Sequence, residues 1–156
     1  MKKITILHIV LIALTVLSLT SIAAKDGPKD GLFRFTTRLT GAAEVNAEGV
    51  PNQGDLDGKG SATITINFGA GTLCWDIFVS GITLPASAAH VHEAPVGVAG
   101  PVVVPLSAPD ASGAASGCTS VSQDELKEII QHPAEYYVNV HNSDFPSGAL
   151  RGQLAQ

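Results

Sequence analysis

SATITINFGAGTLCWDIFVS, residues 61–80, is the clearest structural signal in this chain. Apolar and polar residues alternate from Ser61 to Phe68, which is typical of a strand with one face buried in a core. Gly69-Ala70-Gly71 forms a short turn signal, and the alternation resumes from Thr72 to Ser80. We therefore expect an antiparallel hairpin. Its expected inward side chains are Ala62, Ile64, Ile66, Phe68, Leu73, Trp75, Ile77 and Val79.

Five further runs with strand character predict strands at residues 32–39, 88–93, 101–106, 135–141 and 148–154. Residues 101–106 are branched and apolar between two prolines, which predicts a buried strand. Residues 109–120 are rich in small side chains and predict a loop. Short strands separated by glycine and proline turns predict an antiparallel β-sandwich or a partly closed barrel.

Ser122-Gln123-Asp124-Glu125 has the pattern of a capping box and predicts one helix over residues 123–131. The helix should end at His132-Pro133, because a residue before proline disfavours the helical conformation. Leu126, Ile129 and Ile130 form its apolar stripe. We expect this short helix to lie in a crossover between strands.

Three aromatic residues offer either core packing or a binding surface. Trp75 alternates with Leu73 and Ile77, which favours the core over a surface for glycans or peptides. Tyr136 and Tyr137 should face opposite ways, and we expect one of them to be inside.

The N-terminus has the three parts of a secretory signal peptide. Lys2 and Lys3 precede an apolar run, and small residues follow at Ser21, Ala23 and Ala24. We predict a signal peptide over residues 1–24, with cleavage after Ala23 or Ala24. The alternative is an uncleaved anchor, although the run is shorter than the span of about 20 residues that a bilayer requires. Residues 25–156 would then be one secreted or periplasmic domain, without membrane insertion.

The formal net charge is −5, and both leader lysines count toward the basic residues. Without a basic cluster, the chain does not fit a nucleic acid or an anionic membrane as partner. Cys74 and Cys118 are an even pair in a chain expected to enter an oxidising compartment, which predicts one disulfide. The alternative is two buried free thiols.

His90, His92 and His141 are the candidate metal ligands. His90 and His92 are two residues apart in a predicted strand, so they share a face with Cα atoms roughly 6.7 Å apart. If the strand at 135–141 lies nearby, His141 completes a cluster of three imidazoles that suits copper or zinc. Asn139 shares a face with His141 and is a candidate hydrogen-bond partner in the surrounding layer. The alternative is that all three rings only satisfy neighbouring backbone groups.

Other signals for chemistry are weak. Asp55 and Asp57 stand in a fragment similar to a calcium loop, but the later ligands are missing, and a plain turn fits better. The sequence contains no Gly-x-Ser-x-Gly elbow, phosphate loop or dinucleotide fingerprint. Hydrolase and transferase chemistry therefore has no support.

Four blocks occur in order along the chain: LTGAAEV at 39–45, GSATIT at 60–65, AHVH at 89–92 with Gly97 and GPVV at 100–103, and YVNVH at 137–141 with PSGALRGQL at 146–154. Together they resemble the CHRD domain, the module repeated in chordin and found singly in many bacterial secreted proteins. The resemblance spans about residues 33–154 and implies an all-β, immunoglobulin-like fold. It places His90, His92 and His141 on positions of the family motif. Chordin is an extracellular protein that binds growth factors.

His90-Val91-His92-Glu93 is also similar to a strand of copper/zinc superoxide dismutases, which are secreted β-sandwiches with one disulfide. The chain lacks their bridging histidine and zinc-site aspartate, so only a three-histidine site is conceivable. We predict an immunoglobulin-like or superoxide-dismutase-like sandwich that serves as a non-catalytic binding or structural module. Its partner would be an extracellular protein or matrix component. The alternative is a copper or zinc protein with dismutase-like activity.

Overall fold

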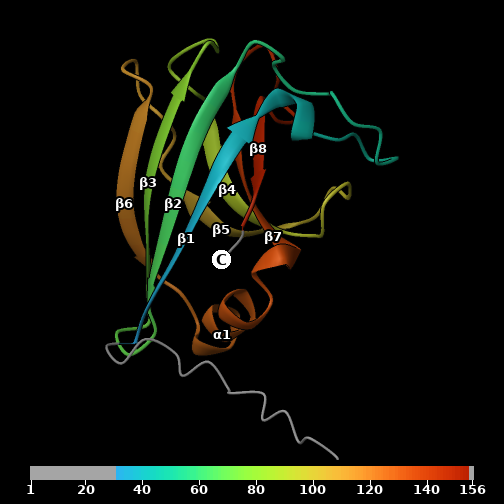
Figure 1. Cartoon of the computed structure of the whole chain (residues 1–156). Helices are drawn as coiled ribbons and strands as arrows, with labels where there is room; N and C mark the ends of the chain where they lie inside the picture. The colour runs from blue at the N-terminus through green and yellow to red at the C-terminus, as the bar shows by residue number, and fades with distance from the viewer. Residues whose placement is uncertain (1–30, 155–156) are drawn as a thin grey trace, which may run out of the picture.

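The structure is a computed structural model that describes residues 31–154, so the predicted signal peptide lies outside the described residues. The described chain forms eight strands, one α-helix and two short 3-10 helices (Figure 1). In chain order they are β1 Leu32–Thr40, η1 Gly41–Ala43, β2 Lys59–Asn67, β3 Thr72–Ser80, β4 Ala88–Glu93, β5 Val102–Leu106, β6 Ala114–Ser120, α1 Gln123–Gln131, η2 Pro133–Glu135, β7 Tyr136–His141 and β8 Leu150–Gln153.

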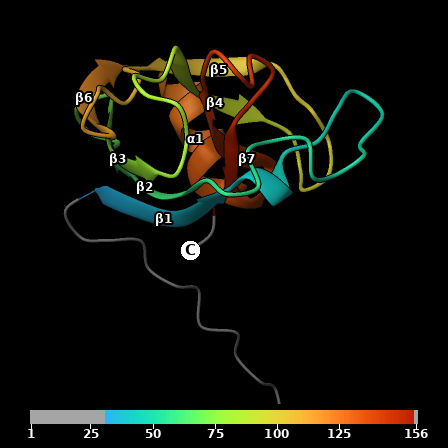
Figure 2. The ribbon, with the colours of Figure 1, turned by 90° about the horizontal axis from the view of Figure 1, so that it is seen from above.

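All paired strands are antiparallel and belong to one sheet in the order β5-β4-β7-β8-β1-β2-β3-β6. The sheet curves around a common interior and nearly closes into a barrel (Figure 2). Its two four-stranded halves meet where Thr40 of β1 pairs with Arg151 of β8. The all-β prediction is confirmed, but the β1–β8 pairing joins the halves of the predicted sandwich into one sheet. The helix α1 connects β6 of one half with β7 of the other, as expected for a crossover.

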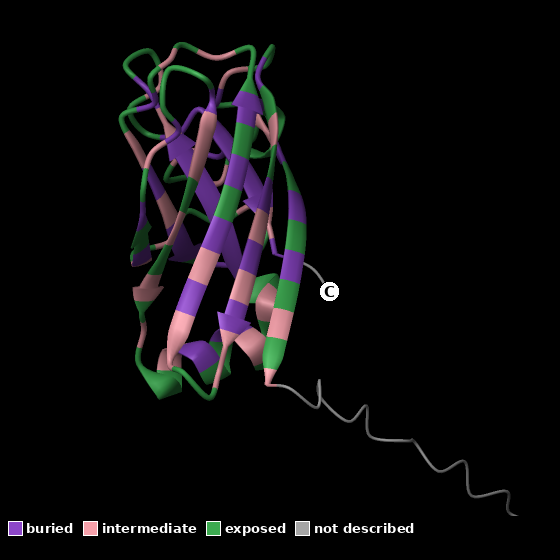
Figure 3. Cartoon of the chain, turned by 90° about the vertical axis from the view of Figure 1, so that its left-hand side faces the viewer, coloured by how far each residue is buried: buried purple, intermediate pink, exposed green. Residues whose placement is uncertain are grey.

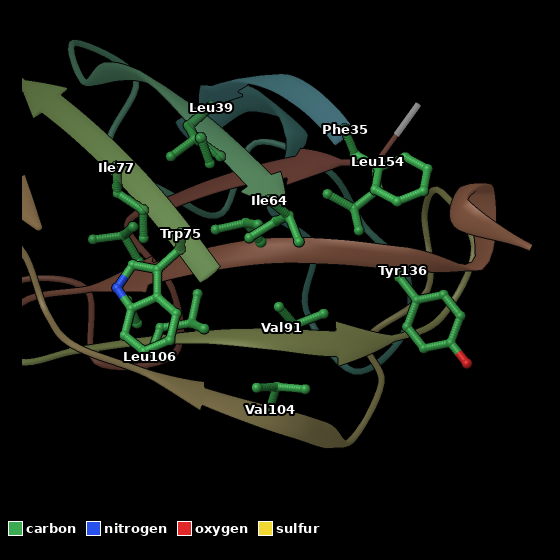
Figure 4. Packing of buried hydrophobic residues seen from close by; sticks show 14 of the residues in the cluster. Phe35, Leu39, Ile64, Trp75, Ile77, Val91, Val104, Leu106, Tyr136 and Leu154 are labelled. Carbon is green, nitrogen blue, oxygen red and sulfur yellow. The ribbon is translucent and has the colours of Figure 1, made fainter. Parts of the chain in front are cut away.

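The hairpin β2–β3 supplies much of the core. Ala62, Ile64 and Ile66 are fully buried, and Trp75 packs with them while its Nε1 donates to Ser107 Oγ at 3.0 Å. Figure 3 shows the alternation as bands of buried and exposed residues along the strands, and Figure 4 shows the inward side chains meeting. Three of the other side chains predicted to point inward are also buried, namely Leu73, Ile77 and Val79. Phe68 is the exception, because it lies just beyond the end of β2 and is only partly buried.

The predicted loop at 109–120 is wrong, because residues Ala114–Ser120 form strand β6. Its small side chains give no strand signal of their own. The strand forms by pairing with β3 over seven residues from Thr72↔Ser120 to Phe78↔Ala114. Small size is required there, since a Cβ on Gly117 would lie 2.5 Å from Trp75 Cζ2.

The disulfide Cys74–Cys118 is present and links directly paired residues of β3 and β6. This confirms the predicted pairing and ties the edge strand β6 to the sheet. The other edge, β5, is also more open than predicted. Val104 and Leu106 are buried as predicted, whereas Val102 is 48% exposed and Pro105 is also exposed.

The helix α1 has the predicted bounds, and the Ser122 side chain accepts a hydrogen bond from the Glu125 backbone N–H at 3.1 Å. Leu126 and Ile129 are fully buried in the core, while Ile130 packs against it. Within residues 31–154, no helix has the length and apolar character needed to cross a membrane.

Candidate metal centre

The outer face of strands β4 and β7 carries the three histidines. On β4, Ala89 and Val91 enter the core, so His90 and His92 point to the opposite face. The same alternation on β7 sends Tyr136, Val138 and Val140 inward and leaves Tyr137, Asn139 and His141 on the outer face.

Antiparallel pairing of β4 with β7 brings these faces together. His90 lies opposite Asn139, and Ala88 lies opposite His141, so His90 and His141 are diagonal neighbours. The predicted meeting of the three rings is therefore confirmed. The ring centroids of His90 and His92 are 5.5 Å apart, those of His90 and His141 are 5.0 Å apart, and those of His92 and His141 are 6.1 Å apart.

Backbone carbonyls orient two of the rings. His92 Nδ1 lies 2.9 Å from Gly100 O, and His141 Nδ1 lies 3.0 Å from Pro146 O. A carbonyl oxygen only accepts, so each Nδ1 carries the hydrogen and donates it. Whenever a ring held in this way is unprotonated at its other nitrogen, its lone pair is on Nε2. This is the arrangement by which proteins commonly orient metal-binding imidazoles.

The Nε2 atom of His92 is buried and has no hydrogen-bond partner among the described residues. The whole residue is only 8% exposed, so water gives it little compensation. Leaving such an acceptor unpaired costs about 1–3 kcal/mol. An unpaired lone pair beside two other imidazoles is a ready ligand for a cation.

The spacing of the ring nitrogens suits a first-row transition metal. His90 Nδ1 donates a hydrogen bond to His141 Nε2 at 3.2 Å, since His141 Nδ1 is the donor to Pro146 O. The same spacing is close to the roughly 3.3 Å between two nitrogens bound to a tetrahedral zinc ion, so an ion would take the place of this hydrogen bond. One ligand atom from each ring lies within 4.8 Å of the others. Ligands of a tetrahedral ion are roughly 3.3 Å apart, so a pair as wide as 4.8 Å must move inward by about 1.5 Å. Within residues 31–154, this is the one such cluster of three or more His, Cys, Asp or Glu residues.

The electrostatic setting favours neutral imidazoles. Burial lowers the pKa of His90, and the neighbouring His141 and His92 lower it further. Burial is also the main cause that lowers the pKa of His92; the Gly100 carbonyl opposes it, while His141 and Arg151 reinforce it. Since metals bind the unprotonated ring, these shifts keep His90 and His92 available as ligands below neutral pH.

Asn139 lies on the predicted face but has different partners from those expected. Its side-chain N–H groups donate to Glu44 Oε2 and to Leu150 O, and not to a histidine. Glu44 is itself 4% exposed and accepts a second hydrogen bond from the Val45 N–H. Asn139 therefore anchors the segment after β1 onto β7, and Gly100 and Pro146 take the role expected of it.

Tyr137 and Arg151 are parts of the site that the sequence did not identify. The two tyrosines of β7 face opposite ways, as predicted, with Tyr136 in the core. Tyr137 on the outer face is also buried, at 3% exposed. The Tyr137 ring stacks on His92, and the Arg151 guanidinium lies 3.5 Å from the centroid of the Tyr137 ring. The alternation Tyr137-x-Asn139-x-His141 placed the tyrosine on the histidine face, but no sequence signal indicated the stack.

A cavity of about 440 Å³ lies beside the histidines and is lined by His92, Tyr137 and Asn139 together with loop residues. Glu44 and Asp144 contribute its acidic groups, and no lysine or arginine of the described chain lines it. The cavity therefore disfavours anions. The Asp55 fragment is a turn, as predicted, in which the Asp57 N–H donates to Asp55 Oδ1 at 3.2 Å.

Comparison with known families agrees with the resemblance of the four sequence blocks. The family model of the CHRD domain matches residues 35–154, from within β1 to just past β8. No curated protein and no solved structure gives a significant match. The match includes every element that builds the histidine cluster. The chain belongs to the CHRD domain family.

Proposed function

We propose that this CHRD domain is an exported, non-catalytic binding module that holds one copper or zinc ion through His90, His92 and His141. The observation that carries this proposal is the buried, unpartnered Nε2 of His92 beside two other imidazoles. A structural role alone would leave the cost of that atom without compensation, whereas a cation would satisfy it.

The carbonyl contacts support the same function. Gly100 and Pro146 fix the hydrogen on Nδ1 of two rings. The Nε2 lone pair of His92 is then free for a ligand, whereas that of His141 accepts from His90 Nδ1 and would exchange this hydrogen bond for a bond to the ion. Three imidazoles without a thiolate suit zinc or copper better than calcium or magnesium, which prefer oxygen ligands. A bound ion would supply Lewis acidity or, for copper, one-electron redox chemistry.

Binding is favoured over superoxide dismutation. A dismutase gains from positive charge that attracts the superoxide anion. Here Glu44 and Asp144 line the neighbouring cavity, and the nearby Arg151 is 2% exposed and directs its N–H groups to backbone carbonyls. Among the described residues, the site therefore lacks an exposed positive group that would attract superoxide.

The partner that we propose is an extracellular protein or matrix component, in the secreted or periplasmic space. The sandwich-like packing of the two halves is compatible with an immunoglobulin-like or superoxide-dismutase-like relationship.

Metal titration of the purified protein tests this function. Calorimetry with zinc and with copper should give one site per chain. At free metal one hundred times the dissociation constant, the free energy of unfolding should rise by about 2.7 kcal/mol. The variant His92→Ala should lose both effects.

His132→Ala is the matched control, because the His132 side chain is 59% exposed at the end of α1 and lies outside the cluster. It should bind metal like the wild type. Equal binding by His92→Ala and the wild type, or no binding at micromolar metal, would overturn the proposed function.

A further inference from the structure

The Tyr137 side chain is held between two groups on the outer face of β4, β7 and β8. Its ring lies 4.8 Å from the His92 ring, with an angle of 11° between the two planes. On Tyr137 the Arg151 guanidinium makes a cation–π contact at 3.5 Å. His92 and Tyr137 are direct partners in the β4–β7 pairing, and Arg151 lies on the next strand.

Arg151 is rigidly anchored. Its Nη1 donates to Val98 O at 2.8 Å, and its Nη2 donates to Pro95 O at 2.9 Å and to Gln153 Oε1 at 3.2 Å. The residue is 2% exposed, so the guanidinium has little freedom to leave the Tyr137 ring. The same bonds pin the loop between β4 and β5 against the sheet.

That loop carries Gly100, which contacts both aromatic rings. Its carbonyl accepts from His92 Nδ1, and its N–H donates to the Tyr137 hydroxyl at 3.2 Å. A Cβ at this position would lie 1.9 Å from Glu93 O, so only glycine allows the loop to pack this closely on β4. The His92 ring is therefore fixed on one face by Tyr137 and along one edge by Gly100.

We propose that Tyr137 and Arg151 are positioning residues of the metal centre, which hold the His92 ring with Nδ1 protonated and Nε2 free to bind the ion. This inference rests on the proposed metal-binding function. Groups that orient a metal-binding histidine change metal affinity by about 10–100-fold when they are removed. Tyr137 would hold the His92 ring by stacking on it, and Arg151 would hold the Tyr137 ring in the orientation that this stacking requires.

Tyr137→Leu removes the stacked ring, while Tyr137→Phe keeps the ring and loses only the hydroxyl. Competition titrations with copper(II) should show weaker binding by about 10–100-fold for Tyr137→Leu, with a changed electron paramagnetic resonance spectrum. Tyr137→Phe should retain the wild-type spectrum and most of the affinity. Arg151→Lys, which keeps the charge and loses the planar fork, should fall between the two.

Ile77→Val in β3 is the control for general loss of stability, because Ile77 is fully buried in the core and does not belong to the cluster. It should lower the melting temperature without changing the copper affinity or spectrum. If Tyr137→Leu also has wild-type affinity and spectrum, the positioning role is wrong. If His92→Ala also retains them, the metal site itself is wrong, so the two failures are distinguishable.

A measurement without metal keeps the inference testable even if Tyr137→Leu does not fold. In the wild-type protein, nitrogen NMR of the His92 ring should show a protonated Nδ1 and an unprotonated Nε2 near neutral pH. A ring protonated on Nε2, or a rapidly exchanging mixture of both forms, would overturn the positioning role.

Discussion

Replacement of His92 by leucine separates a metal-binding role from a purely structural one. Without metal, the change removes the hydrogen bond from His92 Nδ1 to Gly100 O, which contributes about 0.5–1.5 kcal/mol. It also removes the buried, unpartnered Nε2, whose cost is about 1–3 kcal/mol. The two effects oppose each other and leucine still fills space. The free energy of unfolding in chelator should therefore change by no more than about 1 kcal/mol.

With metal present, only the wild type should gain stability. At free zinc one hundred times the dissociation constant, the wild type gains about 2.7 kcal/mol and His92→Leu gains none. Urea unfolding followed by tryptophan fluorescence, once with chelator and once with zinc, measures both differences. An equal loss of about 1–3 kcal/mol in both conditions would show that the ring serves only to satisfy buried backbone groups, and it would refute the metal role.

Three further predictions concern the scaffold and pH. Replacing Cys74 and Cys118 together by serine should lower the free energy of unfolding by about 4 kcal/mol, because the disulfide closes a loop with a sequence separation of 44; an unchanged urea midpoint would contradict this. Burial and neighbouring charge lower the pKa of His90 and His92 in the folded protein, so the unfolded chain takes up protons at a higher pH. The free energy of unfolding of the metal-free protein should therefore fall as pH decreases below about 6.5. In His92→Leu it should depend less on pH between 7 and 5, and an equal dependence would contradict this. Gly117→Ala places a methyl group 2.5 Å from the Trp75 indole and should lower the free energy of unfolding by about 1–3 kcal/mol, with an altered tryptophan fluorescence spectrum. Unchanged stability and fluorescence would contradict the packing of β6 against Trp75.

Local patterns predicted the elements whose signal lies within a few residues. The alternation in residues 61–80 identified the β2–β3 hairpin and its inward face. The capping box at Ser122 marked the start of α1, and His132-Pro133 marked its end. The same alternation put His90 and His92 on one face. The disulfide followed from the number of cysteines and the expected compartment, and needed no geometry.

The missed features depend on contacts between distant parts of the chain. The strand β6 has small side chains and forms because β3 pairs with it and because Gly117 leaves room for Trp75. Asn139 binds Glu44, which is 95 residues earlier, so its partner was not visible in the motif around it. The orientation of His92 depends on Gly100 in a loop whose position is set by Arg151 from another strand.

Metal binding by the three imidazoles remains the central claim, and X-ray absorption on the zinc-loaded protein tests it most directly. We expect one zinc ion per chain with a shell of three imidazole nitrogens at about 2.0–2.1 Å. The imidazole signal should disappear in the double variant His90→Ala with His92→Ala. A shell made of oxygen ligands alone, or an unchanged spectrum in the double variant, would contradict the claim.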